Sequence, residues 1–270
     1  MKVLTAIALK GALVLALTSA AIAEDVPRIH EPYLAGRDVP WVPTPHVLID
    51  KMLDMARLTP RDVVVDLGSG DGRTVIAAAR RGALARGVEF NPELLALSKR
   101  LAAEAGVAEA VTLTEGNMYD ADFSDATVLP LFLMTENLDQ LVPKFLALRP
   151  GTRILNNGFE FSNWDYDEIG HLNGEACGKW CVAYLYIVPA RVAGRWRTDQ
   201  GELELQQEFQ WLTGTLTTRG GKRMPIERGR VQGDVIRFNV GTTRYSGRVS
   251  GDTISGQLAG EAMLRWSATR

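Results

Sequence analysis

The residues best suited to bind a ligand lie in one short segment, residues 63–72, which reads VVVDLGSGDG. An apolar run leads into Asp66, and glycines then occupy every second position, so the backbone can turn sharply and approach a ligand closely. Glu89 follows at the end of a second apolar run. A carboxylate there can accept hydrogen bonds from both hydroxyls of a ribose. The spacing therefore predicts a nucleoside pocket.

The glycine spacing separates two kinds of nucleoside cofactor. A dinucleotide fingerprint reads G-x-G-x-x-G or A, and would need a small residue where Arg73 stands. Asp66 and Asp71 are also poorly placed beside a pyrophosphate. They suit a ligand that carries an ammonium and a sulfonium group, as S-adenosylmethionine does. A dehydrogenase is therefore the least favoured hypothesis, although glycine-rich turns occur in many α/β proteins.

Strands and helices alternate around this segment. The predicted strands are 62–67, 86–90, 110–114, 126–134 and 152–158, with helices at 72–81, 92–105 and 137–148. A helix capped by Thr44 precedes them, and an antiparallel strand at 182–188 follows. Pro130 inside the fourth run indicates a bulge or an edge strand. The order predicts an α/β fold, a Rossmann-like sheet with helices on both faces.

Composition divides the chain into four segments. Residues 1–23 are predicted to be a signal peptide, residues 24–43 an N-terminal extension and residues 44–189 the α/β domain. After Pro189, short alternating runs punctuated by glycines predict seven or eight antiparallel strands. Residues 190–270 are therefore predicted to form a small all-β domain, either a barrel or a sandwich.

The first 23 residues have the pattern of a secretory signal. Lys2 and Lys10 give a positive start, residues 11–20 an apolar core, and residues 21–23 (AIA) a cleavage site. The uncharged stretch is too short to cross a bilayer, so no stable membrane span is expected after cleavage. An uncleaved anchor is the alternative. The segment predicts export to the periplasm.

The two cysteines, Cys177 and Cys181, lie close together in the sequence. In an oxidising compartment such a pair predicts a disulfide that closes a short loop, with free buried thiols as the alternative. Only His171 lies nearby, so no metal is expected.

The overall charge is nearly balanced. A formal charge of −2 and a pI near 6.0 give no indication of a nucleic-acid partner, because proteins that bind nucleic acid usually carry a basic patch.

Four segments resemble the FAM173 and DOT1-like group of class I protein lysine methyltransferases. They are 40–45 (PWVPTP), 66–79 (DLGSGDGRTVIAAA), 87–94 (GVEFNPEL) and 149–154 (RPGTRI), and the likeness covers residues 38 to about 165. It implies the class I methyltransferase fold and S-adenosylmethionine as cofactor, with the proline-threonine segment over its methionine part. By matching position, the expected cofactor-binding residues are Thr44, Asp66, Gly68, Ser69, Gly70 and Glu89.

Asn117 and Met118 follow the third predicted strand, where class I enzymes place residues near the adenine. The resemblance implies that Asn117 hydrogen-bonds the adenine edge and that Met118 packs on the ring. The alternative is a loop residue followed by a core side chain.

Glu136 is the candidate catalytic residue on the acceptor side, in the turn 134–137 (MTEN). Its carboxylate can bind an ammonium group or take a proton from an acceptor. Equally, it can be a first-turn acid that stabilises the next helix. Asn156 and Asn157 are weaker candidates for the same cleft. The chain has no N-P-P-[YF] sequence, which disfavours amide and nucleobase acceptors.

These features predict an S-adenosylmethionine-dependent methyltransferase with an unidentified acceptor, for which the resemblance suggests a protein side chain. The sulfonium is already activated, so in-line transfer needs alignment more than acid–base chemistry. Export leaves the cofactor's supply unexplained, because S-adenosylmethionine is made in the cytosol. An exported module that binds the cofactor or a partner without turnover is therefore the alternative.

Overall fold

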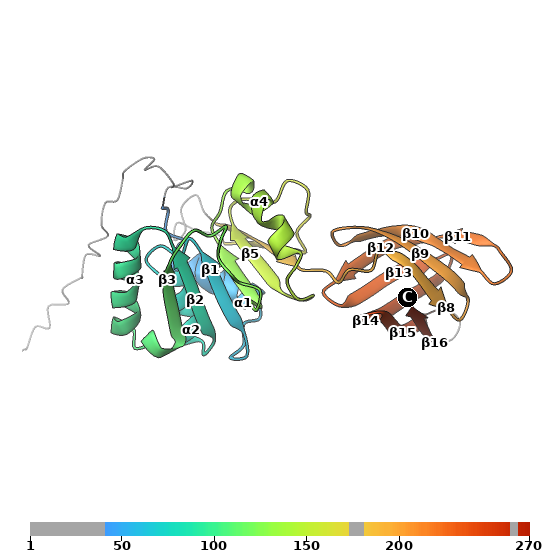
Figure 1. The fold of residues 1–270 in the computed structure, drawn as a ribbon, viewed down its shortest axis with the longest axis horizontal. Coiled ribbons are helices and arrows are strands. Elements are labelled where there is room, and N and C mark those ends of the chain that lie inside the picture. Colours follow the sequence, from blue (N-terminus) through green and yellow to red (C-terminus); the bar gives the residue numbers. More distant parts are fainter. Residues whose placement is uncertain (1–40, 173–180, 260–263) are drawn as a thin grey trace, which may run out of the picture.

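The computed structural model describes residues 41–172, 181–259 and 264–270. Within them the chain forms two units, each built on its own sheet and drawn side by side in Figure 1. The predicted signal peptide, most of the predicted N-terminal extension and Cys177 lie outside the described residues.

The first unit is built on a seven-stranded sheet in the order β3-β2-β1-β4-β5-β7-β6. Strands β1 to β5 are parallel, and β7 is antiparallel to both of its neighbours, as predicted for residues 182–188. The carboxyl ends of the parallel strands meet at one edge, where ligands bind in sheets of this kind. The strands are β1 Val63–Leu67, β2 Leu84–Glu89, β3 Val111–Glu115, β4 Val128–Leu131, β5 Arg153–Asn157, β6 Glu168–His171 and β7 Val182–Ile187.

Strand β4 differs from its prediction. It is shorter than the apolar run at 126–134 and lies at the centre of the sheet, although Pro130 suggested an edge strand or a bulge. Its register with β1 comprises only Val64 and Val128, whereas Pro130 itself pairs with Leu155 of β5. Because proline has no N–H to donate, a central strand tolerates it where pairing on one side has already ended.

Helices cover the two faces of this sheet unequally. Helix α1 (His46–Met55) and helix α2 (Arg73–Arg80) bury their apolar sides with Val64 and Leu155 on one face. Helix α3 (Pro92–Glu104) packs beside α2. Helix α4 (Thr135–Phe145) covers the other face over β4 and β5. Neighbouring residues of a strand point to opposite faces, so continuous apolar runs supply both cores.

Two helices expected from a doubly wound pattern are absent from the α4 face. Only a loop connects β3 to β4, so Thr112 and Thr114 on β3 remain exposed. After β5, the segment 158–167 packs aromatic rings in place of a helix. Phe161 lies edge-on to Tyr186 with ring centroids 4.6 Å apart, and Trp164 follows at 5.2 Å from Phe161. The prediction of helices on both faces is therefore confirmed, but α4 is the single described helix on this face.

The second unit is a barrel-like antiparallel sheet of nine strands, β8 to β16. Strand β9, at one end of the strand order, also pairs with β10, which is next to the other end. This pairing closes the sheet and decides for a barrel over a sandwich. Large side chains such as Trp196, Phe238 and Trp266 fill its interior. The strands are β8 Gly194–Thr198, β9 Gly201–Glu208, β10 Trp211–Thr218, β11 Arg223–Pro225, β12 Glu227–Gln232, β13 Val235–Val240, β14 Thr243–Ser250, β15 Thr253–Ala259 and β16 Leu264–Thr269.

The barrel joins the first unit at the amino end of β5, away from the carboxyl edge. Asp167, almost fully buried, accepts hydrogen bonds from Arg230 at 2.6 Å, Gln232 at 3.1 Å and the backbone of Ile187 at 2.7 Å. The rings of Trp164 and Phe209 stack with centroids 5.4 Å apart. These contacts between the barrel and the first unit lie away from the carboxyl ends of β1 and β2. The predicted domain boundary near residue 190 falls between β7 and β8.

Candidate active site

The glycine turn leaves β1 at the carboxyl edge. Gly68, Gly70 and Gly72 have φ of 78°, 56° and 78°, in the left-handed region that favours glycine. The N–H groups of Gly68 and Ser69 both donate to the carbonyl of Val88, at 2.8 and 3.0 Å. These bonds hold the turn, residues 68–72, against the end of β2.

Glu89 is fixed beside this turn. Its Oε2 accepts from the N–H of Gly70 at 2.7 Å, and its Oε1 accepts from the N–H of Asn91 at 2.8 Å. The residue is buried, yet each carboxylate oxygen has a further lone pair. The geometry suits an acid that presents both oxygens to the two hydroxyls of a ribose.

Asp66 is buried at the end of β1. Desolvation is the main cause that raises the pKa of its carboxyl to about 8; a hydrogen bond with Thr74 opposes the rise, and the nearby charges of Glu89 and Asp71 add to it. Placing an uncompensated charge here is costly. A cationic ligand group would favour the ionised carboxylate, which matches the ammonium end of S-adenosylmethionine.

Residues 41–45, here called the strap, lie across the glycine turn. A Cβ atom added to Gly70 would collide with the indole of Trp41. Arg73 donates from Nη1 to the carbonyl of Thr44 at 3.3 Å and binds the carboxylate of Asp71 through Nε and Nη2. The pattern identified Thr44, but Trp41 and Arg73 were missed as components of this site.

The side chain of Thr44 does not cap α1. Pro45 is the N-cap residue, and no side-chain hydrogen bond is formed there. The backbone carbonyl of Thr44 is instead the acceptor that joins the strap to Arg73. Its hydroxyl is left for another partner, in a residue that is itself buried.

These residues fit S-adenosylmethionine. Around Gly68, no atom lies within 4 Å of the position a Cβ would take, so this part of the turn borders open space. Ser69, by contrast, is buried, and its Oγ has no hydrogen-bond partner. An open glycine backbone, two buried acids and an unpartnered hydroxyl agree with a cationic nucleoside ligand.

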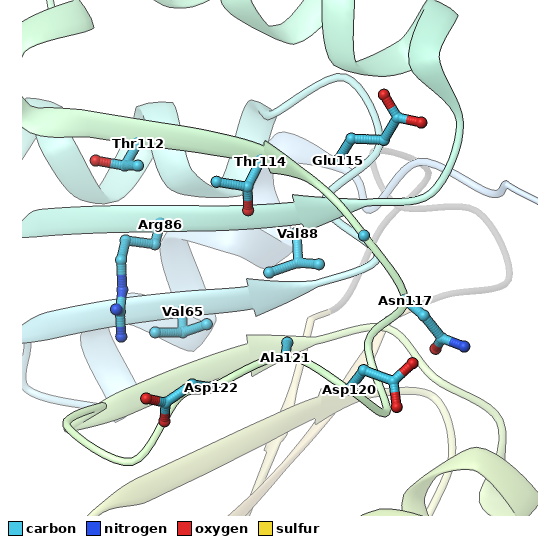
Figure 2. A pocket seen from close by; sticks show the side chains of 11 residues that line it. Val65, Arg86, Val88, Thr112, Thr114, Glu115, Asn117, Asp120, Ala121 and Asp122 are labelled. Carbon is cyan, nitrogen blue, oxygen red and sulfur yellow. The ribbon is translucent and has the colours of Figure 1, made fainter.

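A cavity of about 410 Å³ lies beneath the segment that follows β3, on the α4 face of the sheet, where no helix covers β2 and β3. Figure 2 shows Val65, Arg86 and Val88 projecting into it, with Asp120, Ala121 and Asp122 along its other side. The cavity begins near the carboxyl edge and continues down the exposed side of β2 and β3.

The two predicted adenine contacts differ in their surroundings. Asn117 lies at the rim of this cavity, and its Oδ1 accepts from the N–H of Tyr119 at 2.9 Å. Met118 is half-buried against the apolar core under α4, which agrees with the core-packing alternative. Contact of either residue with adenine stays a prediction.

Glu136 lies in the first turn of α4, exposed, where a carboxylate also stabilises the helix. The loops after β4 and β5 meet close to it. Thr135 donates to the carbonyl of Glu160 at 2.8 Å, and the rings of Phe132 and Phe159 lie 6.3 Å apart. Glu160 also hydrogen-bonds Tyr184, which with burial raises the pKa of that phenol. Glu160 and Tyr184 were missed because only tertiary pairing brings their segments together.

The neighbouring asparagines of β5 have different surroundings. Asn156 accepts from the N–H of Leu133 at 3.0 Å and donates to the carbonyls of Leu133 and Phe159, both at 2.9 Å. It thereby ties the two acceptor-side loops together. Asn157 is fully buried, and neither of its amide atoms has a hydrogen-bond partner.

Of the two cysteines, Cys181 lies at this edge of the sheet, because Ala183 of β7 pairs with Asn157 at the end of β5. Cys181 directly precedes β7, but Cys177 is not among the described residues, so their pairing stays a prediction. Within the described ranges, no group of three or more metal-ligating side chains occurs. No described helix is both long and apolar enough to cross a membrane.

Comparison with known proteins identifies the family. The model of the ANTKMT methyltransferase domain matches residues 66–168. A protein-lysine N-methyltransferase of Saccharolobus islandicus is 35% identical over 56% of this chain and 94% of its own length. The adenine nucleotide translocase lysine N-methyltransferase of Mus musculus is 33% identical, over 47% of this chain and 56% of that protein. The chain thus spans about half the length of the mouse relative.

A solved structure agrees in fold. It is described as an RNA methyltransferase from Salinibacter ruber in complex with S-adenosyl-L-homocysteine. The alignment has a TM-score of 0.52 and 38% identity, and covers 56% of this chain and 96% of that one. The carboxyl-edge site and these relatives together show that the chain belongs to the ANTKMT family of S-adenosylmethionine-dependent methyltransferases.

Proposed function

We propose that this methyltransferase acts on the side-chain amine of lysine residues in a protein. The observation that carries the proposal is the chemistry of the acceptor side, where the Thr135–Glu160 hydrogen bond and the Phe132–Phe159 ring pair join the two segments that carry Glu136 and Glu160. Carboxylates attract an ammonium group and repel the phosphates of a nucleic acid. The relatives named as lysine methyltransferases support the same acceptor class.

Transfer of the methyl group requires alignment and a neutral amine. The lone pair of the lysine nitrogen would form a bond to the methyl carbon while the carbon–sulfur bond breaks. The electrons of the broken bond would stay on sulfur. Positioning supplies roughly 7–11 kcal/mol of barrier reduction in well-oriented reactions. In this proposal Glu136 binds the acceptor ammonium and takes its proton, whereas Asn156 holds the two loops in register.

Replacement of Glu136 by Gln tests the role of the carboxylate. Methyl transfer from labelled S-adenosylmethionine to a lysine-peptide array should fall at least tenfold, whereas calorimetry should give an unchanged affinity for S-adenosylhomocysteine. Glu104→Gln, an exposed change on α3, is the matched control. Equal turnover by Glu136→Gln and the control would mean that Glu136 only stabilises the start of α4. Methylation of RNA but not of peptides by the wild type would contradict the acceptor class.

We also propose that the protein is exported to the periplasm and that Cys177 and Cys181 form a disulfide there. The pattern of residues 1–23 supports export, and the finding that Cys181 is not a free thiol supports the bond. A reporter fused after residue 30 should be active only outside the cytosol. Alkylation without reductant should add no label to the periplasmic protein, whereas two labels would contradict the disulfide.

A further inference from the structure

The two units carry opposite net charge. Residues 190–270 contain 13 Lys and Arg against 8 Asp and Glu, a net charge of +5. Residues 1–189 contain 17 against 24, a net charge of −7. The nearly neutral total therefore conceals a basic barrel attached to an acidic methyltransferase unit, and the basic residues of the barrel need an explanation of their own.

Three of these arginines share the outer surface of neighbouring barrel strands. Arg237, Arg244 and Arg265 are exposed, and each adjoins an inward-facing aromatic residue, so each points outward. Arg237 aligns with Ser246, Ser246 with Gln257, and Gln257 with Arg265, in one row across β13 to β16. Arg244 lies diagonally from Arg237, about 7–8 Å away at this register. We call these three arginines the basic face.

None of the three arginines of the basic face forms an ion pair with a carboxylate among the described residues. Some barrel arginines do form such pairs: Arg248 with Asp234, Arg270 with Asp252, and Arg230 with Asp167. Arg197, Arg219, Arg223 and Arg228 form none within the described part of the chain, but they do not lie in the row that joins Arg237 to Arg265. Arg237 also lies directly opposite Arg230, a like-charge cross-strand pair that weakens a sheet. Three uncompensated guanidinium groups on a rigid sheet, with only neutral polar residues in the row between them, form a surface suited to anions.

The surroundings of the basic face favour a lipid surface over a nucleic acid. Leu264, 60% exposed, is the first residue of β16, beside Arg265. It pairs with Leu258, so it lies on the inward side of the sheet and is exposed at the end of the barrel. Apolar side chains beside cations suit the boundary between headgroups and acyl chains. Binding of single-stranded nucleic acid instead uses exposed aromatic rings. The described strands β12 to β16 expose no large aromatic side chain, because Phe238, Tyr245 and Trp266 all point into the barrel.

We propose that the barrel docks the enzyme onto an anionic phospholipid bilayer through Arg237, Arg244 and Arg265, with Leu264 at the adjoining end of the barrel. The β13–β14 turn and the start of β16 lie at the barrel end opposite the 233–234 turn, which contacts Gly151 of the methyltransferase unit. Arg244 and Arg265 lie toward this far end, whereas Arg237 is opposite Arg230 and so nearer the junction. In this proposal the basic face lies on a membrane while the carboxyl edge of the first unit remains free for an acceptor. This role is independent of methyl transfer.

Vesicle binding tests the proposal. The purified full chain should sediment with vesicles of 70% phosphatidylcholine and 30% phosphatidylglycerol, but much less with pure phosphatidylcholine, and 0.5 M NaCl should release it. Each basic residue near an anionic bilayer contributes roughly fivefold in affinity. Arg237→Glu combined with Arg244→Glu should therefore weaken binding at least tenfold.

The matched control reverses the same number of charges elsewhere on the barrel. Arg195→Glu with Arg197→Glu on β8 gives the same net charge, and its binding should stay within about twofold of wild type. All variants share residues 1–40, so any contribution of that segment cancels in the comparison. Affinity for S-adenosylhomocysteine verifies that each variant is folded.

Two results would overturn the proposal. Equal losses in the two double variants would mean that only net charge matters, and no preference for phosphatidylglycerol would exclude an anionic bilayer as the partner. Binding to RNA or polyglutamate through the same arginines, without vesicle binding, would assign the basic face to a different class of macromolecule.

Discussion

At the scale of single residues, the site depends on backbone and burial more than on reactive side chains. Asp66 illustrates this: it is one residue of an apolar strand, yet complete burial beside Glu89 and Asp71 raises its pKa to about 8. Glu89, in contrast, has both oxygens held by backbone N–H groups. Two neighbouring carboxylates thus have different roles because their surroundings differ.

Asp66 makes stability and cofactor binding depend on pH. Between about pH 4 and 8 the Asp66 carboxyl is protonated in the folded protein but ionised in the unfolded chain. Its contribution to the free energy of unfolding is therefore full below about pH 4 and is lost as the pH rises through 8. A cationic ligand favours the carboxylate, so affinity for S-adenosylmethionine should rise from pH 6 to 8. Calorimetry should give a flatter profile for Asp66→Asn, and an equal slope in both proteins would contradict this assignment.

Gly70 should be more sensitive to substitution than its φ alone predicts. Gly70→Ala places a Cβ both in the left-handed region and against Trp41, so affinity for S-adenosylhomocysteine should fall at least tenfold. Gly106→Ala is the control, because its φ is 71° but no atom lies within 4 Å of the new Cβ. Backbone strain should lower the free energy of unfolding by a similar amount in both variants, because both place alanine at a positive φ; denaturant unfolding measures this. Unchanged binding by Gly70→Ala would show that the strap and turn can separate freely.

At the scale of elements, the acceptor side is held together by Asn156. Replacement by Leu removes hydrogen bonds to the loops after β4 and β5 and leaves buried backbone groups unpaired, at a cost of about 2–3 kcal/mol of unfolding free energy. Asn157→Leu should be neutral or stabilising, because its buried amide has no partner to lose. Urea unfolding measures both. Equal destabilisation would mean that packing alone, rather than hydrogen bonding, explains the effect.

Local pattern predicted elements well where each could be identified by its own residues. Strands β1, β2, β3, β5 and β7 and helices α2 and α3 follow from apolar runs and helical spacing near the predicted positions. Strand β6 was missed because its four residues have no strand pattern and pair only with β7. No helix was predicted between the third and fourth strands, and the structure has none; Met118 and Phe123 pack against the core from a loop. Such differences arise from tertiary burial, which overrides local preference.

At the scale of the whole molecule, Asp167 links the two units. Its carboxylate is almost fully buried, whereas Arg230 is about one-third exposed, so solvent weakens the pair below the value for a fully buried one. Asp167→Ala should cost about 2 kcal/mol at this junction and split the calorimetric unfolding into two transitions. Asp234→Asn, which loses only an exposed pair with Arg248, should keep the wild-type profile. A single transition in both variants would contradict this role for the junction.

By itself, the sequence determined the α/β order and predicted the cofactor site within it: the glycine turn, Asp66, Glu89 and the segment at Thr44. These features are readable because each depends on residues close in sequence and on backbone conformations that few residue types allow. Tertiary structure alone decided that Trp41 covers Gly70, that Glu160 meets Tyr184, and that β9 pairs with β10 to close a barrel. It also collected Arg237, Arg244 and Arg265 on one surface, because strand register brings residues far apart in the chain onto the same face.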